Sequence, residues 1–526
     1  MRVVTFTIGA AAIVAAAVGC GGSATQPTSV SGSVSYRQPS QGWTARVPAG
    51  WQSVALGPGF VRGDPLTDPT RLVLEAYPNH TPAAALREFS SLQGIAVTAK
   101  EGTQTGEQLR WQRYRGTKNG EPALAVELAV ARDGANAHVA ALVARRARLD
   151  GLVQTALLPA LDSFAPGSPA KPQSVLATAP ADPAYWPTDG WRTASPAAEG
   201  VEGARLDAMV AEIRTAKLPI DSVTVVRHGY VVLDQTFGTF AAGTLGEPYA
   251  SGRRHELQSA TKSVVSMLLG MATAAHPKSG ITVRTPVLDL AAAAKYSPAN
   301  VDARKRAMTL ADMLTMQSGL AWRESGYAYT PGSGNDVMAM LATDNWATYV
   351  IDRPMAAQPG TVFNYDTGTS HLLSAAVTLA ARQPTAAFAA THLFAPLGIS
   401  DYRWLSSPEG ITAGGFGLQL QPLDLAKLAY LYLHQGRWDG RQIVPAAWVQ
   451  ESTTDHVASP PNEYGYLWWL DGADGYAYMI GLYGQLAVVD PGKDLVAVIT
   501  SHVPATEDSG AVTRWLLERY VLPAAR

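Results

Sequence analysis

Short hydrophobic runs bounded by Gly, Pro or Asn recur through the first third of the 526-residue chain and predict β-strands. These runs cover residues 43–51, 70–77, 107–116, 122–132 and 138–144. Two longer segments, 81–92 and 148–164, repeat their apolar residues at helical spacing and predict amphipathic helices. The pattern predicts a small α/β domain over residues 36–165.

A Pro-, Ala- and Ser-rich segment, 166–189, then predicts an interdomain linker. Globular composition resumes at residue 190 and continues to 526, enough for one large mixed domain with a substantial core. Alternation on both sides of His228-Gly229 predicts a β-hairpin, and 484–501 predicts a second one that turns at 490–494. A helix-rich segment separates the two hairpins, and a C-terminal helix is expected over 510–521.

The chain opens with Arg2 and an apolar run over 8–18, which is shorter than the roughly 20 residues of a membrane-spanning helix. The run therefore predicts an export signal over 1–20. Residues 17–20, AVGC, resemble a bacterial lipobox, and this resemblance implies that Cys20, the only cysteine, carries lipid. Residues 21–35 would then be a flexible tether. The protein would lie on the outer face of the bacterial cell membrane. The alternative is an ordinary signal peptide followed by an incidental cysteine.

Composition excludes several classes of function. Lys and Arg number 41 against 43 for Asp and Glu, so no basic field suggests a nucleic-acid partner. A single cysteine excludes a disulfide framework and a cysteine-based zinc site. Neither HExxH nor CxxC occurs, so no metal or cofactor is expected.

Ser259 and Lys262 form the first chemical pair, at positions i and i+3 before an apolar helical run. If Ser259 begins that helix, both side chains lie on one face and the helix N-terminus points N–H groups at the serine. A serine nucleophile needs a base within hydrogen-bond reach, and burial can lower the pKa of a lysine enough for it to act as one. The alternative is an N-cap serine beside a solvated lysine. The pattern itself is weak, since Ser168 and Lys171 also match it in the Pro-rich linker.

Tyr365 is the second candidate, followed by Asp366 and Thr367. A phenol near a lysine ammonium should have a lowered pKa and can pass a proton to a leaving group. The Y-x-[NST] pattern also occurs at Tyr77 and Tyr249, so a core tyrosine is the alternative.

These residues belong to a series of motifs that resembles the serine β-lactamase-like family over residues 190–526. In chain order, the motifs read IDSVTVVRHGYVVLDQ, HELQSATKSVVSMLLG, LADMLTMQSGLAW, PGTVFNYDTGTSHLLSAAV, LFAPLGI, GGFGLQLQPLDLAKLAYLYLHQGRWDG, YGYLWW and IGLYGQLAVVDP. The family includes class C β-lactamases, DD-peptidases, EstB-type esterases and 6-aminohexanoate-dimer hydrolase. The resemblance implies a mixed α+β fold, with an antiparallel sheet flanked by helices and an additional all-helical region.

The resemblance also implies roles. Ser259 would be the acylated nucleophile, Lys262 its base or proton relay, and Tyr365 the group that protonates the leaving group and then activates water. The backbone N–H groups of Ser259 and Leu482 would form the oxyanion hole. Trp322, Tyr327 and Tyr329 follow the SGL turn, where family members line the substrate cleft.

Two motifs depart from the family pattern. Met479-Ile480-Gly481 stands where KTG or HxG is usual, and Thr367 stands where β-lactamases carry asparagine. The missing lysine would be the cation that faces the carboxylate of a β-lactam or a D-Ala terminus. Ile480, Gly481 and Thr367 would therefore line a cleft for a neutral substrate. The HQG sequence that ends at Gly436 does not replace the motif, because it closes a leucine-rich helix and predicts a C-cap.

The sequence thus predicts an exported, lipid-anchored serine hydrolase of the esterase or amidase type, which acts on a small-molecule or peptide-like ester or amide. A β-lactamase or DD-peptidase, and a non-catalytic envelope binding lipoprotein, are the alternatives. The N-terminal domain resembles the Mog1/PsbP-like lipoprotein domains, which implies a structural role or the binding of an unidentified partner.

Overall fold

The computed structural model describes residues 32–38, 41–54, 59–62, 68–167, 173–237, 253–457, 463–504 and 510–525. Cys20, the predicted signal peptide and most of the predicted tether lie outside these residues. The first strand, β1 (Ser33–Arg37), begins inside the segment 21–35 that the sequence assigns to the tether. Its side chains are largely exposed, so no hydrophobic pattern marked it as a strand.

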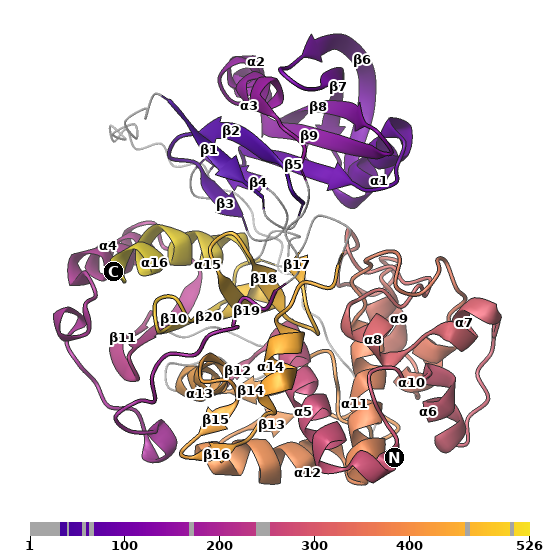
Figure 1. The fold of residues 1–526 in the computed structure, drawn as a ribbon, viewed down its shortest axis with the longest axis vertical. Helices are drawn as coiled ribbons and strands as arrows, with labels where there is room; N and C mark the ends of the chain where they lie inside the picture. The colour runs from indigo at the N-terminus through magenta and orange to yellow at the C-terminus, as the bar shows by residue number, and fades with distance from the viewer. Residues whose placement is uncertain are drawn as a thin grey trace.

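The N-terminal domain contains a seven-stranded antiparallel sheet in the order β3-β4-β5-β9-β8-β7-β6 (Figure 1). The strands are β3 (Gln52–Val54), β4 (Gly59–Val61), β5 (Arg71–Tyr77), β6 (Ile95–Thr105), β7 (Arg110–Lys118), β8 (Leu124–Asp133) and β9 (Asn136–Arg145). The helices are α1 (Pro82–Leu92), α2 (Arg146–Leu152), the π-helical η1 (Val153–Leu157) and α3 (Leu158–Ser163). β1 pairs separately with β2 (Thr44–Pro48).

Both faces of this sheet are covered. Leu142 of β9 packs into a core with α2, η1 and α3, whereas its neighbour Val143 packs into a second core with α1. Alternate residues of a strand point to opposite faces, so a strand covered on both sides is hydrophobic throughout. The strands and helices predicted for this domain are confirmed to within a few residues. Strand β6 escaped prediction because nearly all its residues are exposed.

The second domain contains another seven-stranded antiparallel sheet, in the order β11-β10-β21-β20-β19-β18-β17. Its strands are β10 (Ile220–Arg227), β11 (Tyr230–Thr236), β17 (Glu463–Tyr464), β18 (Trp469–Asp471), β19 (Tyr476–Gly481), β20 (Gln485–Asp490) and β21 (Leu495–Ser501). The two predicted hairpins are β10–β11 and β20–β21. Short strands elsewhere are β12 (His255–Glu256), β13 (Arg403–Trp404), β14 (Leu418–Leu420), β15 (Arg437–Trp438) and β16 (Arg441–Gln442).

Helices cover both faces of this sheet (Figure 1). One side holds α4 (Gly203–Thr215) and the C-terminal helical segment α15 (Ala511–Leu516), η9 (Leu517–Val521) and α16 (Leu522–Ala524), and the other holds α13 (Pro422–Leu433). α13 ends at Leu433 with His434 as its C-cap, so the C-cap predicted at Gly436 is two residues too late; Gly436, with φ 74°, lies in the left-handed turn that follows.

A helical region adjoins the sheet, and its central pair, α5 (Thr261–Ala275) and α11 (Thr367–Ala381), packs side by side. Both helices are buried on nearly all faces, as their apolar sequences require. The others are α6 (Val287–Ala293), α7 (Ala303–Ala307), α8 (Leu310–Leu314), α9 (Asp336–Leu341), α10 (Trp346–Ile351), α12 (Thr385–Ala389) and α14 (Ala446–Ser452). The predicted mixed α+β fold, with an antiparallel sheet and an all-helical region, is confirmed.

The second domain also includes residues that the sequence assigns to the linker 166–189. Leu176 is fully buried in its core, and the Val175 N–H donates to Thr453 O at 3.0 Å, within an isolated antiparallel bridge between Ser174 and Thr454. Tyr185 donates its hydroxyl to Gly229 O at 2.7 Å. Apolar and aromatic residues within the Pro-rich segment fix it to the domain, so the connection between the domains is shorter than predicted. Within the described residues, no helix combines the length and the apolar character needed to cross a membrane.

Candidate active site

Ser259 lies in a 3-10 turn, η4 (Gln258–Ala260), directly before α5. The helix thus begins at Thr261, two residues later than the sequence suggested. Gln258 has φ 50°, a left-handed conformation that L-residues adopt at a cost and that is often found at functional turns. The turn places Ser259 against β19, at the junction of the sheet and the helical region.

Gly481, the last residue of β19, allows this close approach. A Cβ atom at this position would lie 2.1 Å from Leu257 O and 3.1 Å from Ser259 N. The strand end therefore passes the serine backbone at a distance that only glycine permits. Leu482 follows as the first residue of the 3-10 turn η8 (Leu482–Gly484), so the second predicted oxyanion donor comes directly after the strand that contacts the serine turn.

Lys262 is buried, with 1% of its surface exposed, and its Nζ points at the serine. It donates hydrogen bonds to Ser259 Oγ at 2.8 Å, Thr367 Oγ1 at 2.9 Å and the carbonyl oxygen of Gly415 at 2.9 Å. Burial lowers the pKa of Lys262 to about 8, against the opposing effect of Glu324 and, to a smaller extent, of Asp366 in its ionised form. An amine of this pKa is partly neutral near pH 7, as the predicted base requires.

Tyr365 completes the group. Its phenol shares a hydrogen bond with Ser259, its ring lies 4.8 Å from Lys262 Nζ, and it stacks on Trp469 at 5.8 Å between ring centroids. The expectation that the Lys262 ammonium lowers the pKa of Tyr365 is wrong. Burial, with a further contribution from Glu324, raises the pKa of Tyr365 well above its ordinary value, and the hydrogen bond with Ser259 offsets only part of this. Tyr365 is therefore a neutral phenol that can donate or relay a proton.

Sequence reasoning missed Glu324, a buried carboxylate behind the lysine with 2% of its surface exposed. One oxygen, Oε1, accepts from Thr367 Oγ1 at 2.6 Å and Tyr329 Oη at 2.8 Å. The other, Oε2, accepts from Trp322 Nε1 at 2.7 Å and the Thr367 N–H at 2.8 Å. The only signal in the sequence is an acidic residue two positions after Trp322, which in a loop predicts nothing more than solvent exposure.

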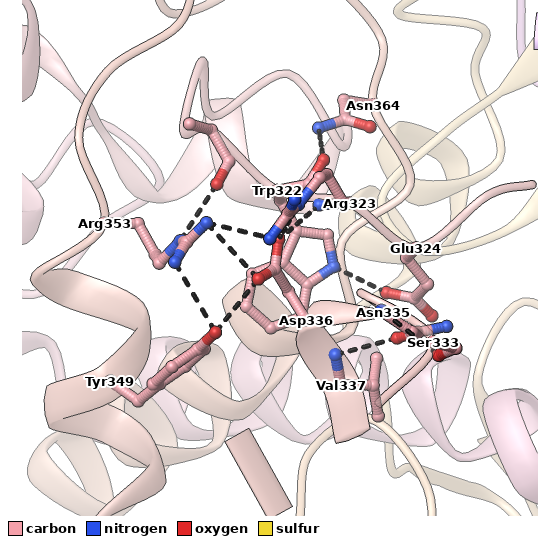
Figure 2. Close-up of polar contacts among 11 residues, drawn as sticks. Trp322, Arg323, Glu324, Ser333, Asn335, Asp336, Val337, Tyr349, Arg353 and Asn364 are labelled. Carbon is pink, nitrogen blue, oxygen red and sulfur yellow. Dashed lines mark hydrogen bonds and ion pairs between the residues drawn. The ribbon is translucent and has the colours of Figure 1, made fainter. Parts of the chain in front are cut away.

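A second buried carboxylate, Asp336 of α9, fixes the loop that carries Glu324 (Figure 2). It accepts from Arg323 N at 2.7 Å and Tyr349 Oη at 2.9 Å, and pairs with Arg353 at 3.3 Å. These bonds stabilise the backbone beside Glu324 without touching the lysine.

The residues predicted to line the substrate cleft differ in how exposed they are and in what they contact. Trp322 is buried and braces Glu324, whereas Tyr327 and Tyr329 keep 40% and 37% of their surface exposed. Thr367, at the start of α11, bonds Lys262 rather than facing solvent. Ile480 lies beside Gly481 on β19, where Met479-Ile480-Gly481 brings neither lysine nor histidine to the site. In the described part of the chain, no cluster of His, Cys, Asp and Glu is arranged to hold a metal ion.

Known proteins similar to this chain are found among protein families and solved structures. No curated protein matches the chain. Among solved structures, a protein described as a 6-aminohexanoate-dimer hydrolase from Bacillus anthracis shares 18% identity over 65% of this chain and 89% of its own, with a TM-score of 0.48. A family VIII carboxylesterase shares 16% identity, over 60% of this chain and 96% of its own, with a TM-score of 0.47.

A penicillin-binding protein homologue from Caulobacter crescentus shares 15% identity, over 61% of this chain and 96% of its own, with a TM-score of 0.47. The family model described as Beta-lactamase matches residues 206–521, which include Ser259, Lys262 and Tyr365. Because this match spans more than half of the chain, the protein belongs to the beta-lactamase family of serine hydrolases.

Proposed function

We propose that the protein hydrolyses neutral esters or amides through an acyl-enzyme on Ser259. The observation that carries the proposal is the 2.8 Å hydrogen bond between Ser259 Oγ and the buried Nζ of Lys262. With a pKa of about 8, the lysine is neutral in about a tenth of the molecules at pH 7. Its free amine then accepts the serine proton as Oγ attacks the substrate carbonyl carbon.

The remaining groups support the following steps. The N–H groups of Ser259 and Leu482 stabilise the negative oxygen that develops on the substrate. Tyr365, held neutral by burial, gives its proton to the leaving alcohol or amine and regains one from the Lys262 ammonium. In the second half of the cycle, the same pair removes a proton from water, the hydroxide attacks the acyl carbonyl carbon, and the proton returns to Ser259 Oγ as the bond to the acyl group breaks.

Charge in the site supports a neutral substrate. Glu324 brings a carboxylate close to Lys262, and β19 supplies no cation that could pair with a substrate carboxylate. An anionic β-lactam or a D-Ala terminus would therefore find repulsion without a matching partner. The exposed rings of Tyr327 and Tyr329 can instead cover an apolar acyl or alcohol group.

The test is covalent labelling. A fluorophosphonate should add to Ser259, as located by peptide mass spectrometry, and Ser259→Ala should abolish the adduct. Absence of an adduct on folded protein would refute the proposal and favour a non-catalytic binding protein. Hydrolysis of nitrocefin faster than short p-nitrophenyl esters would instead support a β-lactamase or DD-peptidase.

Export and membrane anchoring are a separate part of the proposal, which depends on the sequence of residues 1–20 alone. In bacterial cells, metabolic palmitate labelling should mark the protein and be lost in Cys20→Ser. An unlabelled wild-type protein would refute the anchor and leave the hydrolase proposal unchanged.

A further inference from the structure

The feature that the proposed chemistry leaves unused is the hydrogen-bonded chain from Lys262 through Thr367 to Glu324. Thr367 Oγ1 accepts from Lys262 Nζ at 2.9 Å and donates to Glu324 Oε1 at 2.6 Å. Glu324 is surrounded by four donors and is almost completely buried. A carboxylate accepts at both of its oxygens and so satisfies all four donors.

This arrangement fixes the direction of each proton. A hydroxyl has one hydrogen, and Thr367 gives it to Glu324, so the threonine oxygen can only accept from Lys262. The carbonyl oxygen of Gly415 is also an acceptor alone. A neutral lysine amine has two hydrogens and one lone pair. Both hydrogens are taken by these two acceptors, and the lone pair is left facing the Ser259 hydroxyl.

We propose that Glu324 is a positioning residue that acts through Thr367 to aim the lone pair of the neutral Lys262 amine at the Ser259 hydroxyl. The inference rests on the proposed function, because it assigns Lys262 the role of base. Glu324 is thereby added to the proposed site as a residue that does not touch the substrate. No motif in the sequence indicated it.

The charge of Glu324 gives the proposal a measurable signature. The groups that face Lys262 are Ser259 on η4, Tyr365 and Asp366 before α11, and Glu324 on the loop after Leu320. Burial raises the pKa of Asp366 to about 8, so most of this carboxyl is protonated at neutral pH and Glu324 is the principal anion. Loss of the Glu324 charge should lower the pKa of Lys262, because no other nearby group stabilises the ammonium as strongly.

The experiment measures the rate of fluorophosphonate labelling of Ser259 from pH 5 to pH 10, which requires no knowledge of the substrate. Glu324→Gln should slow labelling at the optimum by about tenfold or more and move the acid-limb midpoint down by about one to two pH units, as expected for one charge on the order of 5 Å away. Thr367→Val should slow labelling to a similar degree with a smaller shift, because the charge remains. Thr367→Ser should restore most of the rate, since the hydroxyl is returned.

Glu127→Gln is the control, because it neutralises a fully buried carboxylate of the N-terminal domain that pairs with Arg113 and Arg115, away from the site. Its acid-limb midpoint should stay at the wild-type value even if the fold is weakened. If Glu324→Gln shows the wild-type midpoint, or Thr367→Val labels at the wild-type rate, the positioning role is refuted. If Glu324→Gln does not fold, the comparison of Thr367→Val with Thr367→Ser still tests the positioning role. Failure of the wild-type protein to label would refute the proposed function itself. This outcome is distinct from the two variant results that would refute the positioning role.

Discussion

Substitution of Gly481 by alanine tests whether the contact between β19 and the serine turn supports the reaction. The added Cβ would lie 2.1 Å from Leu257 O and 2.9 Å from Gln258 Cβ. Non-bonded carbon and oxygen atoms need more than 3 Å, so the strand end and the turn must separate by about 1 Å. The backbone of Leu482, the next residue, would move with the strand.

The expected cost follows from the role of the two N–H groups. Loss of one oxyanion donor typically reduces the rate by about 10²–10³, or about 3–4 kcal/mol of transition-state stabilisation, and a displacement of about 1 Å costs about 10². We therefore expect kcat/KM for a p-nitrophenyl ester to fall by about 10²–10³ in Gly481→Ala. Near-ultraviolet circular dichroism would show that the protein assayed is folded.

Gly106→Ala supplies the control. Its Cβ would meet another backbone carbonyl, Leu161 O, at 2.4 Å, but in the N-terminal domain. It should reduce thermal stability while leaving kcat/KM within about threefold of the wild-type value. A folded Gly481→Ala protein with wild-type kcat/KM would show that the strand end contributes nothing to the transition state, and the assignment of Leu482 would be refuted.

Three further predictions concern the lysine, the phenol and the supporting network. The rate of acylation should rise with pH through a midpoint of about 8, because Lys262 accepts the serine proton only when neutral; a rate already maximal at pH 6 would contradict this. Tyr365→Phe should reduce kcat by about 10²–10⁴ with little change in melting temperature, and a near-normal kcat would exclude it as the proton donor. Asp336→Asn should lower the free energy of unfolding in urea by about 3 kcal/mol or more, since it leaves the partly buried Arg353 without its carboxylate partner; an unchanged urea midpoint would count against the network.

The parts of the site that the sequence predicts are those set by local geometry. Ser259 and Lys262 are one helical turn apart, so the serine and the base meet whenever the segment 259–262 is helical. Apolar residues on every side of that helix indicated burial, and burial lowers the pKa of Lys262 as expected. The two hairpins follow from alternation around tight turns in the same way.

What the sequence could not predict depends on contacts between distant segments. Glu324 and Thr367 are 43 positions apart, and the carboxylate meets the N-terminus of α11 only because the loop folds back on it. Burial, which is the larger cause, and the charge of Glu324 together explain the wrong direction expected for the pKa of Tyr365. A phenol beside a lone ammonium would become more acidic, but here the charge of Lys262 is countered by Glu324, and burial then decides the direction. A buried acid behind the lysine thus changes the proton chemistry of the whole group. In this protein, therefore, the Ser-Lys-Tyr motif does not by itself determine which groups are charged, because Glu324, on the loop after the SGL turn, also contributes.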